Sequence, residues 1–271
     1  ASGKAWVIKQ ALKKLRVKTD WFCDPARIYR EAEAVRFLHA QVPQARVPRF
    51  CFEDRENYLL GMESVPEPHQ VWKSELLKGQ VDVELVIQFA EMLAGIHGCS
   101  KETPGLPEVF SDKTYFEALR LEPYYGYAAS QIPKAETFFQ ELMESTRHEN
   151  RFLVHGDFSP KNILAHQNKL HLIDHEVIHL GDGAFDLGFA LTHLLAKSLH
   201  VPGHRVTFRE ACHLFADLYL QSVSSVSKFS SIEERWIKHT LGCLLARVHG
   251  RSPLEYLKES EKETITEKTL E

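Results

Sequence analysis

The stretch His155–Asn162, which reads His-Gly-Asp-Phe-Ser-Pro-Lys-Asn, constrains the fold more than any other part of this chain. Two short apolar runs follow it, Ile163–Ala165 and Leu170–Ile173, and the second leads directly into Asp174. Short apolar runs so close together predict a pair of strands. We therefore expect a polar loop and a strand pair that delivers a second acid to the same place.

Asp157, Asn162 and Asp174 have the residue types and the spacing that phosphoryl transfer needs. The reaction depends on positioning, on charge neutralisation and on a group that orients the attacking hydroxyl. Asp157 is the candidate catalytic residue, because its carboxylate can accept the proton of a substrate hydroxyl. Asn162 and Asp174 can each offer an oxygen to Mg²⁺ on ATP. A simple turn would explain His-Gly-Asp alone, but not the two partners at these intervals.

Further acids surround this motif. Glu176 lies two residues after Asp174, and residues i and i+2 of an extended chain share a face, so Glu176 is a candidate second metal ligand. A surface acid is the alternative. Asp182 is placed to cap the helix that follows it. Asp186 is expected to brace the catalytic loop through hydrogen bonds, and His155 is assigned to structural support of the same loop.

A lysine near the N-terminus completes the pattern. Trp6–Gln10 is predicted to be a short buried strand that carries Lys9, and Arg27–Gln41 has apolar side chains at helical spacing. A Lys–Glu ion pair that holds the lysine against the α- and β-phosphates is a common device in phosphoryl transfer. We prefer Glu31 to Glu33 as the partner, although an edge-strand lysine and an ordinary helix acid remain the alternative.

The composition of the chain changes in the linker Met62–Pro68, which contains two prolines. Before it, Val47–Glu53 and Asn57–Glu63 are predicted to form two strands joined by a polar turn. We therefore divide the chain into an N-terminal lobe, residues 1–64, and a C-terminal lobe, residues 65–271. In the second lobe, periodicity predicts helices at Val83–His97, Thr114–Leu121, Ala135–Glu149, Phe185–Leu199, Thr207–Val226 and Glu233–Val248.

By position alone, the linker residues Met62, Glu63 and Val65 are expected to bind adenine through backbone hydrogen bonds. Arg247 lies near the end of the Glu233–Val248 helix and is a candidate ligand of an anionic or polyhydroxyl substrate. The alternative for it is a cation that meets the helix dipole. The charged C-terminal tail is expected to be a solvated helix end or frayed.

Composition excludes several classes of protein. The net charge of −4 lacks the basic excess of a nucleic-acid-binding protein. No apolar run is long enough for a membrane span, and the start Ala1–Lys4 does not resemble a secretory leader. The five cysteines are odd in number and scattered, which argues against a disulfide framework and a cysteine zinc site. A cytoplasmic setting is therefore expected.

Three motifs together resemble the aminoglycoside phosphotransferase and choline kinase-like superfamily of small-molecule kinases. They are His-Gly-Asp-x-x-x-x-Asn at 155–162, Ile-Asp-x-Glu at 173–176 and Gly-Asp-x-x-Phe-Asp-Leu-Gly at 181–188. Val7–Leu12 and the Asp-x-Glu motif are also similar to methylthioribose kinases. The resemblance extends over nearly the whole chain.

The resemblance implies an α+β, bilobal, protein-kinase-like fold. Its small N-terminal lobe would have an antiparallel sheet and one helix, and its larger C-terminal lobe would be mostly helical. It also implies ATP, Mg²⁺ and transfer of the γ-phosphate to a hydroxyl of a small molecule, such as an antibiotic, a sugar or an amino alcohol. The oligomeric state stays open, with a homodimer as one alternative.

Two departures limit what the resemblance implies. Methylthioribose kinases lack an asparagine in the catalytic loop, whereas this chain has Asn162, so their substrate is not carried over. A glycine-rich loop should precede the lysine strand, but only Ala1–Trp6 stand before Val7, with one glycine. We therefore expect an incomplete N-terminal lobe that lacks this loop.

Other readings of the chain follow from these departures. A catalytically silent, kinase-like nucleotide-binding or regulatory protein is the main alternative function. A protein kinase is disfavoured, because Asp-His-Glu at 174–176 replaces Asp-Phe-Gly. A cationic aminoglycoside substrate would need an acidic pocket, for which the C-terminal lobe offers Glu117, Glu122, Glu141 and Glu144.

Overall fold

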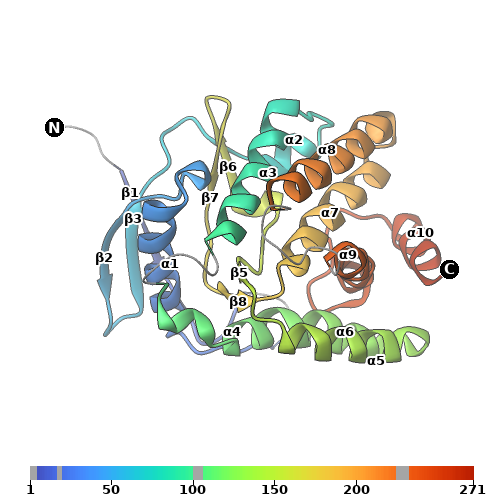
Figure 1. Ribbon diagram of the computed structural model, residues 1–271, viewed down its shortest axis with the longest axis horizontal. Coiled ribbons are helices and arrows are strands. Elements are labelled where there is room, and N and C mark those ends of the chain that lie inside the picture. The colour runs from blue at the N-terminus through green and yellow to red at the C-terminus, as the bar shows by residue number, and fades with distance from the viewer. Residues whose placement is uncertain (1–4, 17–19, 100–105, 224–231) are drawn as a thin grey trace.

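The computed structural model describes residues 5–16, 20–99, 106–223 and 232–271. One end of the molecule is a three-stranded antiparallel sheet with a single long helix packed beside it (Figure 1). The strands have the order β1-β3-β2. Their bounds are β1 Trp6–Gln10, β2 Phe50–Asp54 and β3 Leu59–Glu63, and the helix is α1, Arg27–Gln41.

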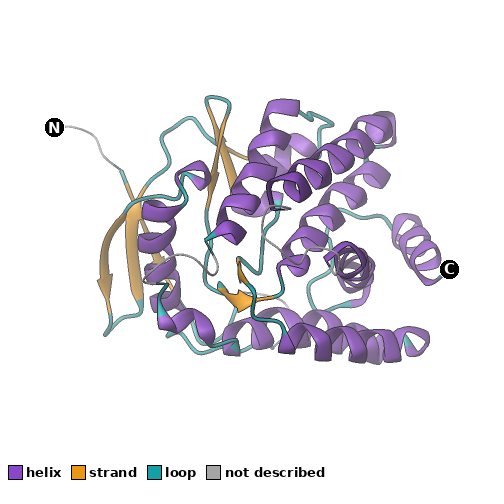
Figure 2. Ribbon diagram, viewed as in Figure 1, coloured by secondary structure: helices purple, strands orange, loops and turns teal. Residues whose placement is uncertain are grey.

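The rest of the molecule is mostly helical, with two small sheets near its centre (Figure 2). Its helices are α2 Trp72–Leu76, α3 Val83–Gly98, α4 Thr114–Phe116, the π-helix η3 Glu117–Gly126, α5 Tyr127–Gln131, α6 Glu136–His148, α7 Gly183–His200, α8 Arg205–Val223, α9 Ile232–His249 and α10 Glu259–Leu270. Its strands are β4 Gln70–Val71, β5 Phe152–Val154, β6 Ile163–His166, β7 Lys169–Leu172 and β8 His179–Gly181. The lobe boundary after residue 64 stays a prediction.

The small sheets hold the polar loop from both sides. The loop begins where β5 ends, and β5 pairs with β8 in antiparallel register. It ends where β6 begins, and β6 pairs with β7 as the two apolar runs predict, Ile163 lying opposite Leu172. Because β7 ends at Leu172, the chain reaches Asp174 beside the start of β6.

A continuous apolar core fixes α1 against the helical part. Ile28, Ala32, Val35 and Leu38 are buried on one face of α1 and belong to the same cluster as side chains of α3 and α8. Such a shared core sets the position of the polar residues that α1 carries at its edge. Elsewhere α7 packs closely on α9, where a Cβ at Gly188 would lie within 2.7 Å of a backbone nitrogen.

Several sequence predictions were wrong in detail. β1 is not buried: it is an edge strand, and Ile8 is 59% exposed. The helix predicted at Thr114–Leu121 is a short α-helix that continues as the π-helix η3, which contains Pro123. Proline has no backbone N–H and cannot donate in a regular α-helix, and the wider π-helical turns accommodate it. Of the two alternatives predicted for the charged tail, the solvated helix is confirmed: it is the regular helix α10, mostly exposed and anchored by buried Ile265.

Other boundaries moved by a few residues. The strand predicted from Val47 begins at Phe50, and the helix predicted from Thr207 begins at Arg205; its predicted end at Val226 falls outside the described residues. None of the helices in the described ranges combines the length and the apolar character that a membrane crossing requires.

Candidate active site

A glycine and an aspartate shape the loop that carries Asp157. Gly156 has a φ of 77°, in the left-handed region, and a Cβ there would lie 2.8 Å from a side-chain carbon of Val177. The backbone amides of His155 and Gly156 donate hydrogen bonds to the two carboxylate oxygens of Asp186, at 2.6 and 2.8 Å. The loop is thereby attached to the first turn of α7.

Asp157 is fully buried among cations and donors. Its Oδ2 lies 2.7 Å from Nη2 of Arg120, 2.8 Å from Nζ of Lys161 and 2.8 Å from Nδ2 of Asn162. Burial would raise the pKa of Asp157, but Arg120 and Lys161 outweigh it and hold the pKa below its usual range. Its Oδ1 is buried without a donor among the described residues. The carboxylate therefore has one satisfied oxygen and one that can accept.

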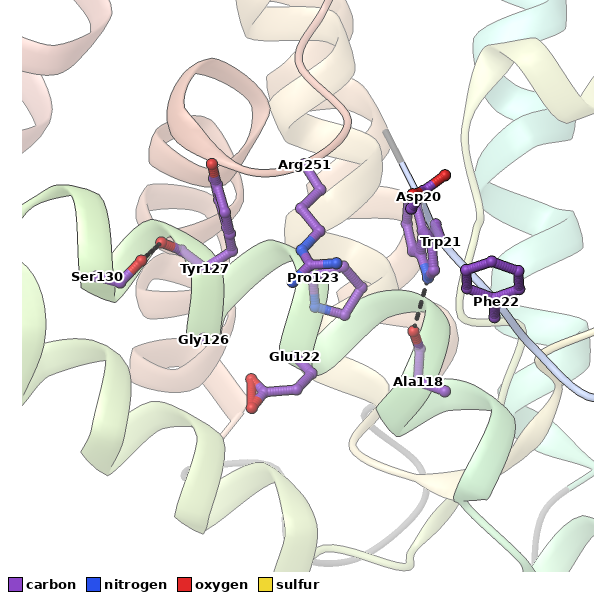
Figure 3. A pocket seen from close by; sticks show the side chains of 10 residues that line it. All are labelled: Asp20, Trp21, Phe22, Ala118, Glu122, Pro123, Gly126, Tyr127, Ser130 and Arg251. Atoms are coloured by element: carbon purple, nitrogen blue, oxygen red, sulfur yellow. Dashed lines mark hydrogen bonds between the residues drawn. The ribbon is translucent and has the colours of Figure 1, made fainter. Parts of the chain in front are cut away.

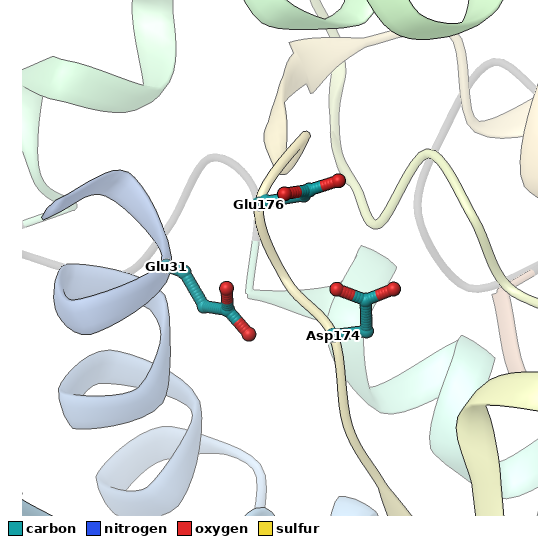
Figure 4. Close-up of side chains that lie close together, drawn as sticks. All are labelled: Glu31, Asp174 and Glu176. Carbon is teal, nitrogen blue, oxygen red and sulfur yellow. The ribbon is translucent and has the colours of Figure 1, made fainter. Parts of the chain in front are cut away.

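Three acids, Glu31, Asp174 and Glu176, lie close together (Figure 4), and Lys9 pairs with two of them. Its Nζ lies 2.6 Å from Oε2 of Glu31 and also donates to Oδ1 of Asp174. Oxygens of Glu31, Asp174 and Glu176 all lie within 4.8 Å of one another. Glu33, the alternative partner of the lysine, instead pairs with Arg36 at 2.6 Å. The N-terminal lysine segment and the Asp174–Glu176 motif, remote in the sequence, thus meet at one point.

Lys9 and Asp174 stabilise each other's charge, whereas burial raises the pKa of Glu31 above its usual value, with Lys9 opposing and the neighbouring acids adding to the rise. Burial would lower the pKa of Lys9, but Asp174 and Glu31 raise it above its usual value. Burial would raise the pKa of Asp174, but Lys9 and Lys161 hold it well below its usual range. Asp174 also has a φ of 69°, a left-handed conformation that aspartate and asparagine tolerate better than most residues.

A cavity of about 400 Å³ opens beside this cluster. It is bordered by Lys9, Glu31, Asn162 and Asp174 at its polar end. The other walls come from β1, from the linker and from the ends of β6 and β7, with Val7, Ile8, Met62, Glu63, Val65, Leu164 and Ile173 among them. The cavity therefore joins the linker residues predicted to bind adenine with those predicted to bind phosphate and metal.

The two linker amides differ. The amide of Glu63 donates to the carbonyl of Arg49 at 2.9 Å, as part of the pairing between β2 and β3. The amide of Val65 makes no hydrogen bond within the described part of the chain. Of the two, Val65 is therefore the residue whose amide can donate to a base in the cavity.

The remaining predicted residues lie behind the loop or away from it. Asp182 is the N-cap of α7, where it accepts a hydrogen bond from the amide of Ala184 and contacts His239 at 2.9 Å. Nδ1 of His155 accepts from the amide of Asp157 at 3.2 Å. Arg247 is buried and is linked to Asp157 only through intervening side chains, described below.

A second cavity, of about 560 Å³, lies between the segment Asp20–Phe22 and the π-helix η3 (Figure 3). Glu122 and Arg251 approach it from opposite sides, and the indole of Trp21 donates to the carbonyl of Ala118 at its edge. The residues that line this cavity include none of the His155–Asn162 loop. The helix η3 borders the cavity and also carries Arg120, which contacts Asp157.

Sequence reasoning missed Arg120 and Lys161, the two cations that contact Asp157. Lys161 could have been found, because it lies four residues after Asp157 in the same motif. Arg120 had a weaker signal, a charge between Leu119 and Leu121 in an apolar stretch. Its partner is remote in the sequence, so only the fold identifies the ion pair.

Comparison with known proteins identifies the family. Residues 15–206 match the phosphotransferase enzyme family APH. The chain belongs to this family. The prediction of an aminoglycoside phosphotransferase and choline kinase-like relationship is thereby confirmed.

The curated relatives include methylthioribose kinases of enteric bacteria. That of Citrobacter koseri is 26% identical over 224 residues, covering 73% of this chain and 56% of the relative. That of Yersinia enterocolitica is 27% identical over 225 residues, covering 73% of this chain and 55% of the relative. The chain spans about half the length of these relatives.

Solved structures of related phosphotransferases have the same fold. An amicoumacin kinase in complex with AMP-PNP, Ca²⁺ and Ami superimposes with a TM-score of 0.57 at 14% identity, over 98% of this chain and 81% of that one. An aminoglycoside phosphotransferase from Alicyclobacillus acidocaldarius gives 0.53 at 17% identity, over 98% and 82%. These likenesses confirm the predicted α+β kinase-like fold.

For the phosphotransfer activity proposed below, replacing Asp186 by asparagine is expected to lower kcat about tenfold while leaving the nucleotide affinity within a factor of two or three. One of its two accepting oxygens becomes an NH₂ group that faces a backbone N–H. Asp182→Asn on the same helix is the matched control. Asparagine caps a helix about as well as aspartate, so the loss of the charge that pairs with Arg235 is expected to cost about 1 to 3 kcal/mol of stability without that loss of kcat. Steady-state kinetics and thermal unfolding separate the two effects. Equal kcat values in both variants would exclude a positioning role for Asp186.

Proposed function

We propose that this protein is a Mg²⁺- and ATP-dependent phosphotransferase that moves the γ-phosphate of ATP to a hydroxyl of a small molecule. One observation carries the proposal. Asp157, with one oxygen held by cations and one able to accept, is hydrogen-bonded to Asn162, which borders the cavity that also contains the Lys9–Glu31 pair and Asp174. The family membership and the relatives named methylthioribose kinase support it.

The proposed reaction is a direct displacement at the γ-phosphorus. The acceptor oxygen forms a new P–O bond while the bond to the β,γ-bridging oxygen breaks, and ADP leaves with that electron pair. The acceptor hydroxyl proton passes to Oδ1 of Asp157, which accepts no hydrogen bond from the described residues. Arg120 and Lys161 keep Asp157 ionised, so it orients the hydroxyl before transfer.

The nucleotide would occupy the cavity of about 400 Å³, with its base against Met62 and its edge bonded to the amide of Val65. Lys9, held by Glu31, would contact the α- and β-phosphates. The walls of the cavity include apolar residues of β1 and β6 and Ile173, which suit a purine ring.

The donor atoms fit a hard divalent cation. Asp174 and Glu176 supply carboxylate oxygens, and the side-chain nitrogen of Asn162 donates to Asp157, which leaves its amide oxygen as a ligand atom. When bound, Mg²⁺ would neutralise charge on the phosphates. Arg27 donates to Oε2 of Glu176 at 2.9 Å and so fixes the orientation of that carboxylate.

We also propose that the protein acts in the cytoplasm and binds no nucleic acid. All five cysteines are free, and three of them, Cys23, Cys212 and Cys243, are buried. The net charge of −4 supports the second point.

The test is ADP release with Mg·ATP across a panel of hydroxyl compounds: methylthioribose, choline, homoserine, aminoglycosides and macrolides. Acceptor-dependent release, together with thermal stabilisation by Mg·ATP, is expected. Stabilisation without release from any acceptor would favour the catalytically silent alternative. The absence of both ADP release and thermal stabilisation would refute the proposal.

A further inference from the structure

One tyrosine connects the Asp157 loop to a second basic region. The guanidinium of Arg120, which pairs with Asp157, lies 5.7 Å from the ring centroid of Tyr124. The guanidinium of Arg247 lies 5.4 Å from the same centroid, and its Nη1 donates to the Tyr124 hydroxyl at 3.2 Å. Two buried arginines thus contact one ring, and among the described residues only the first has a carboxylate partner.

Arg247 and Lys197 are buried basic side chains, and neither forms an ion pair within the described part of the chain. Arg247 is 5% exposed, and its hydrogen bonds go to neutral groups of Tyr124 and Ser252. Lys197 is 0% exposed, and its Nζ donates to the carbonyl of His193 at 3.1 Å. Neither has an acid within ion-pair distance in the described part of the chain. Burying an unpaired charge is costly, so the arrangement suggests a partner from outside the chain.

Tyr256 connects these cations to the surface. Its ring centroid lies 5.4 Å from Nζ of Lys197 and 5.6 Å from Nζ of Lys73. Lys73 pairs with Glu255, a side chain that is mostly exposed, and α2, which carries Lys73, packs against the 3₁₀ turn that contains Lys161. The basic region therefore extends from the surface to the lysine that contacts Asp157.

Several polar atoms in this region lack partners. Nε of Arg247, Nε2 of His193 and the hydroxyl of Tyr256 are buried without a hydrogen bond among the described residues. Burial lowers the pKa of Lys197 to about 7, with Lys73 and Arg247 adding to the effect. These atoms are the donors that an oxyanion accepts from.

We propose that Arg247 and Lys197, with Lys73 and Tyr256 at their edge, bind an anionic group, a phosphate or a carboxylate, of the acceptor whose hydroxyl faces Asp157. This inference rests on the proposed function. It also argues against a cationic aminoglycoside. Of the acids considered for an acidic pocket, Glu117 and Glu144 lie near Arg147. Glu122 lines the other cavity.

Inorganic phosphate is the first probe, with sodium chloride at matched ionic strength as the control for general salt effects. Phosphate is expected to raise the unfolding midpoint, and Lys197→Met is expected to weaken phosphate binding roughly tenfold to a hundredfold. Arg247→Gln should cause a similar loss independently. Lys9→Met should retain binding, which separates this site from the nucleotide phosphates. Lys238→Met, an exposed lysine on α9, is the matched control.

Absence of phosphate stabilisation in the unmodified protein, or equal phosphate affinity in Lys197→Met, would overturn the anion site. Acceptor pairs test its role in the reaction: glycerate against glycerol, and ribose 5-phosphate against ribose. The anionic member of an accepted pair should have the higher kcat/KM, and Lys197→Met should abolish that preference. A preference for the neutral member would overturn the inference and leave the proposed function standing. If none of the acceptors gave ADP release, both the proposed function and the acceptor role of the anion site would be refuted.

Lys197 should also make stability depend on pH. Its pKa falls from 10.5 in the unfolded chain to about 7 in the fold, under burial, Lys73 and Arg247, with Glu255 opposing. Below pH 7, Lys197 is charged in both the folded and the unfolded chain, and the folded state carries the full free-energy cost of burying that charge. As the pH rises from 7 toward 10.5, only the unfolded chain keeps the proton on Lys197, so the free energy of unfolding increases. Lys197→Met is therefore expected to unfold at a higher temperature than the unmodified protein at pH 7, by a margin that shrinks toward pH 10. Thermal unfolding across this range measures it, and a constant margin would contradict it.

Discussion

Replacing Asp157 by asparagine is expected to lower kcat by roughly 10² to 10⁴, the usual contribution of a positioned general base. The amide has the same shape, and its oxygen can take the place of Oδ2 and accept from Arg120, Lys161 and Asn162. Its NH₂ group then occupies the Oδ1 position, where it donates instead of accepting the acceptor proton. Geometry is retained and the proton acceptor is lost.

The measurement is acceptor-dependent ADP release at saturating ATP, with Mg·ATP binding followed by thermal stabilisation. Binding should change little, because Asp157 does not line the nucleotide cavity. Ser159→Ala is the matched control in the same loop, since the buried Ser159 hydroxyl has no hydrogen-bond partner among the described residues. A kcat for Asp157→Asn within a factor of ten of the unmodified protein would remove Asp157 from the chemistry.

The parts of the fold that could be predicted are those encoded locally. The bounds of α1 and β1 matched the periodic pattern, and β6 and β7 were found because two apolar runs are separated by a short polar turn. The candidate site was predictable for the same reason. Motif spacing places Asp157 and Asn162 in one loop, and a strand of defined length carries the chain to Asp174.

Interactions between remote segments were not predictable. β5 and β8 are three residues long, and their pairing joins Phe152 to Gly181, so no local pattern indicates them. The exposure of β1 depends on its place at the sheet edge. Arg120 and Lys197 each appear in the sequence as a charge in an apolar helix. Only tertiary packing shows that Arg120 pairs with an acid, whereas Lys197 has no ion-pair partner among the residues that the structure describes.

Asp174→Asn is the second large effect that we expect, a fall in kcat/KM for Mg·ATP of roughly 10² to 10³. Asparagine is the suitable replacement, because the φ of 69° at this position is tolerated by asparagine about as well as by aspartate. The backbone should therefore keep its course, and Lys9 keeps its pair with Glu31 at 2.6 Å. What is lost is one negative charge at the proposed metal ligand.

The dependence of rate on Mg²⁺ concentration distinguishes that loss from a general disturbance. In Asp174→Asn the Mg²⁺ concentration for half-maximal rate should rise, because a neutral amide oxygen binds a hard cation more weakly than a carboxylate. Glu176→Gln is the matched comparison, expected to give a smaller rise, since one oxygen of Glu176 is already held by Arg27. An unchanged Mg²⁺ dependence in Asp174→Asn would show that Asp174 serves to orient Lys9 and does not bind the metal, and the ligands would then have to be sought at Asn162 and Glu176.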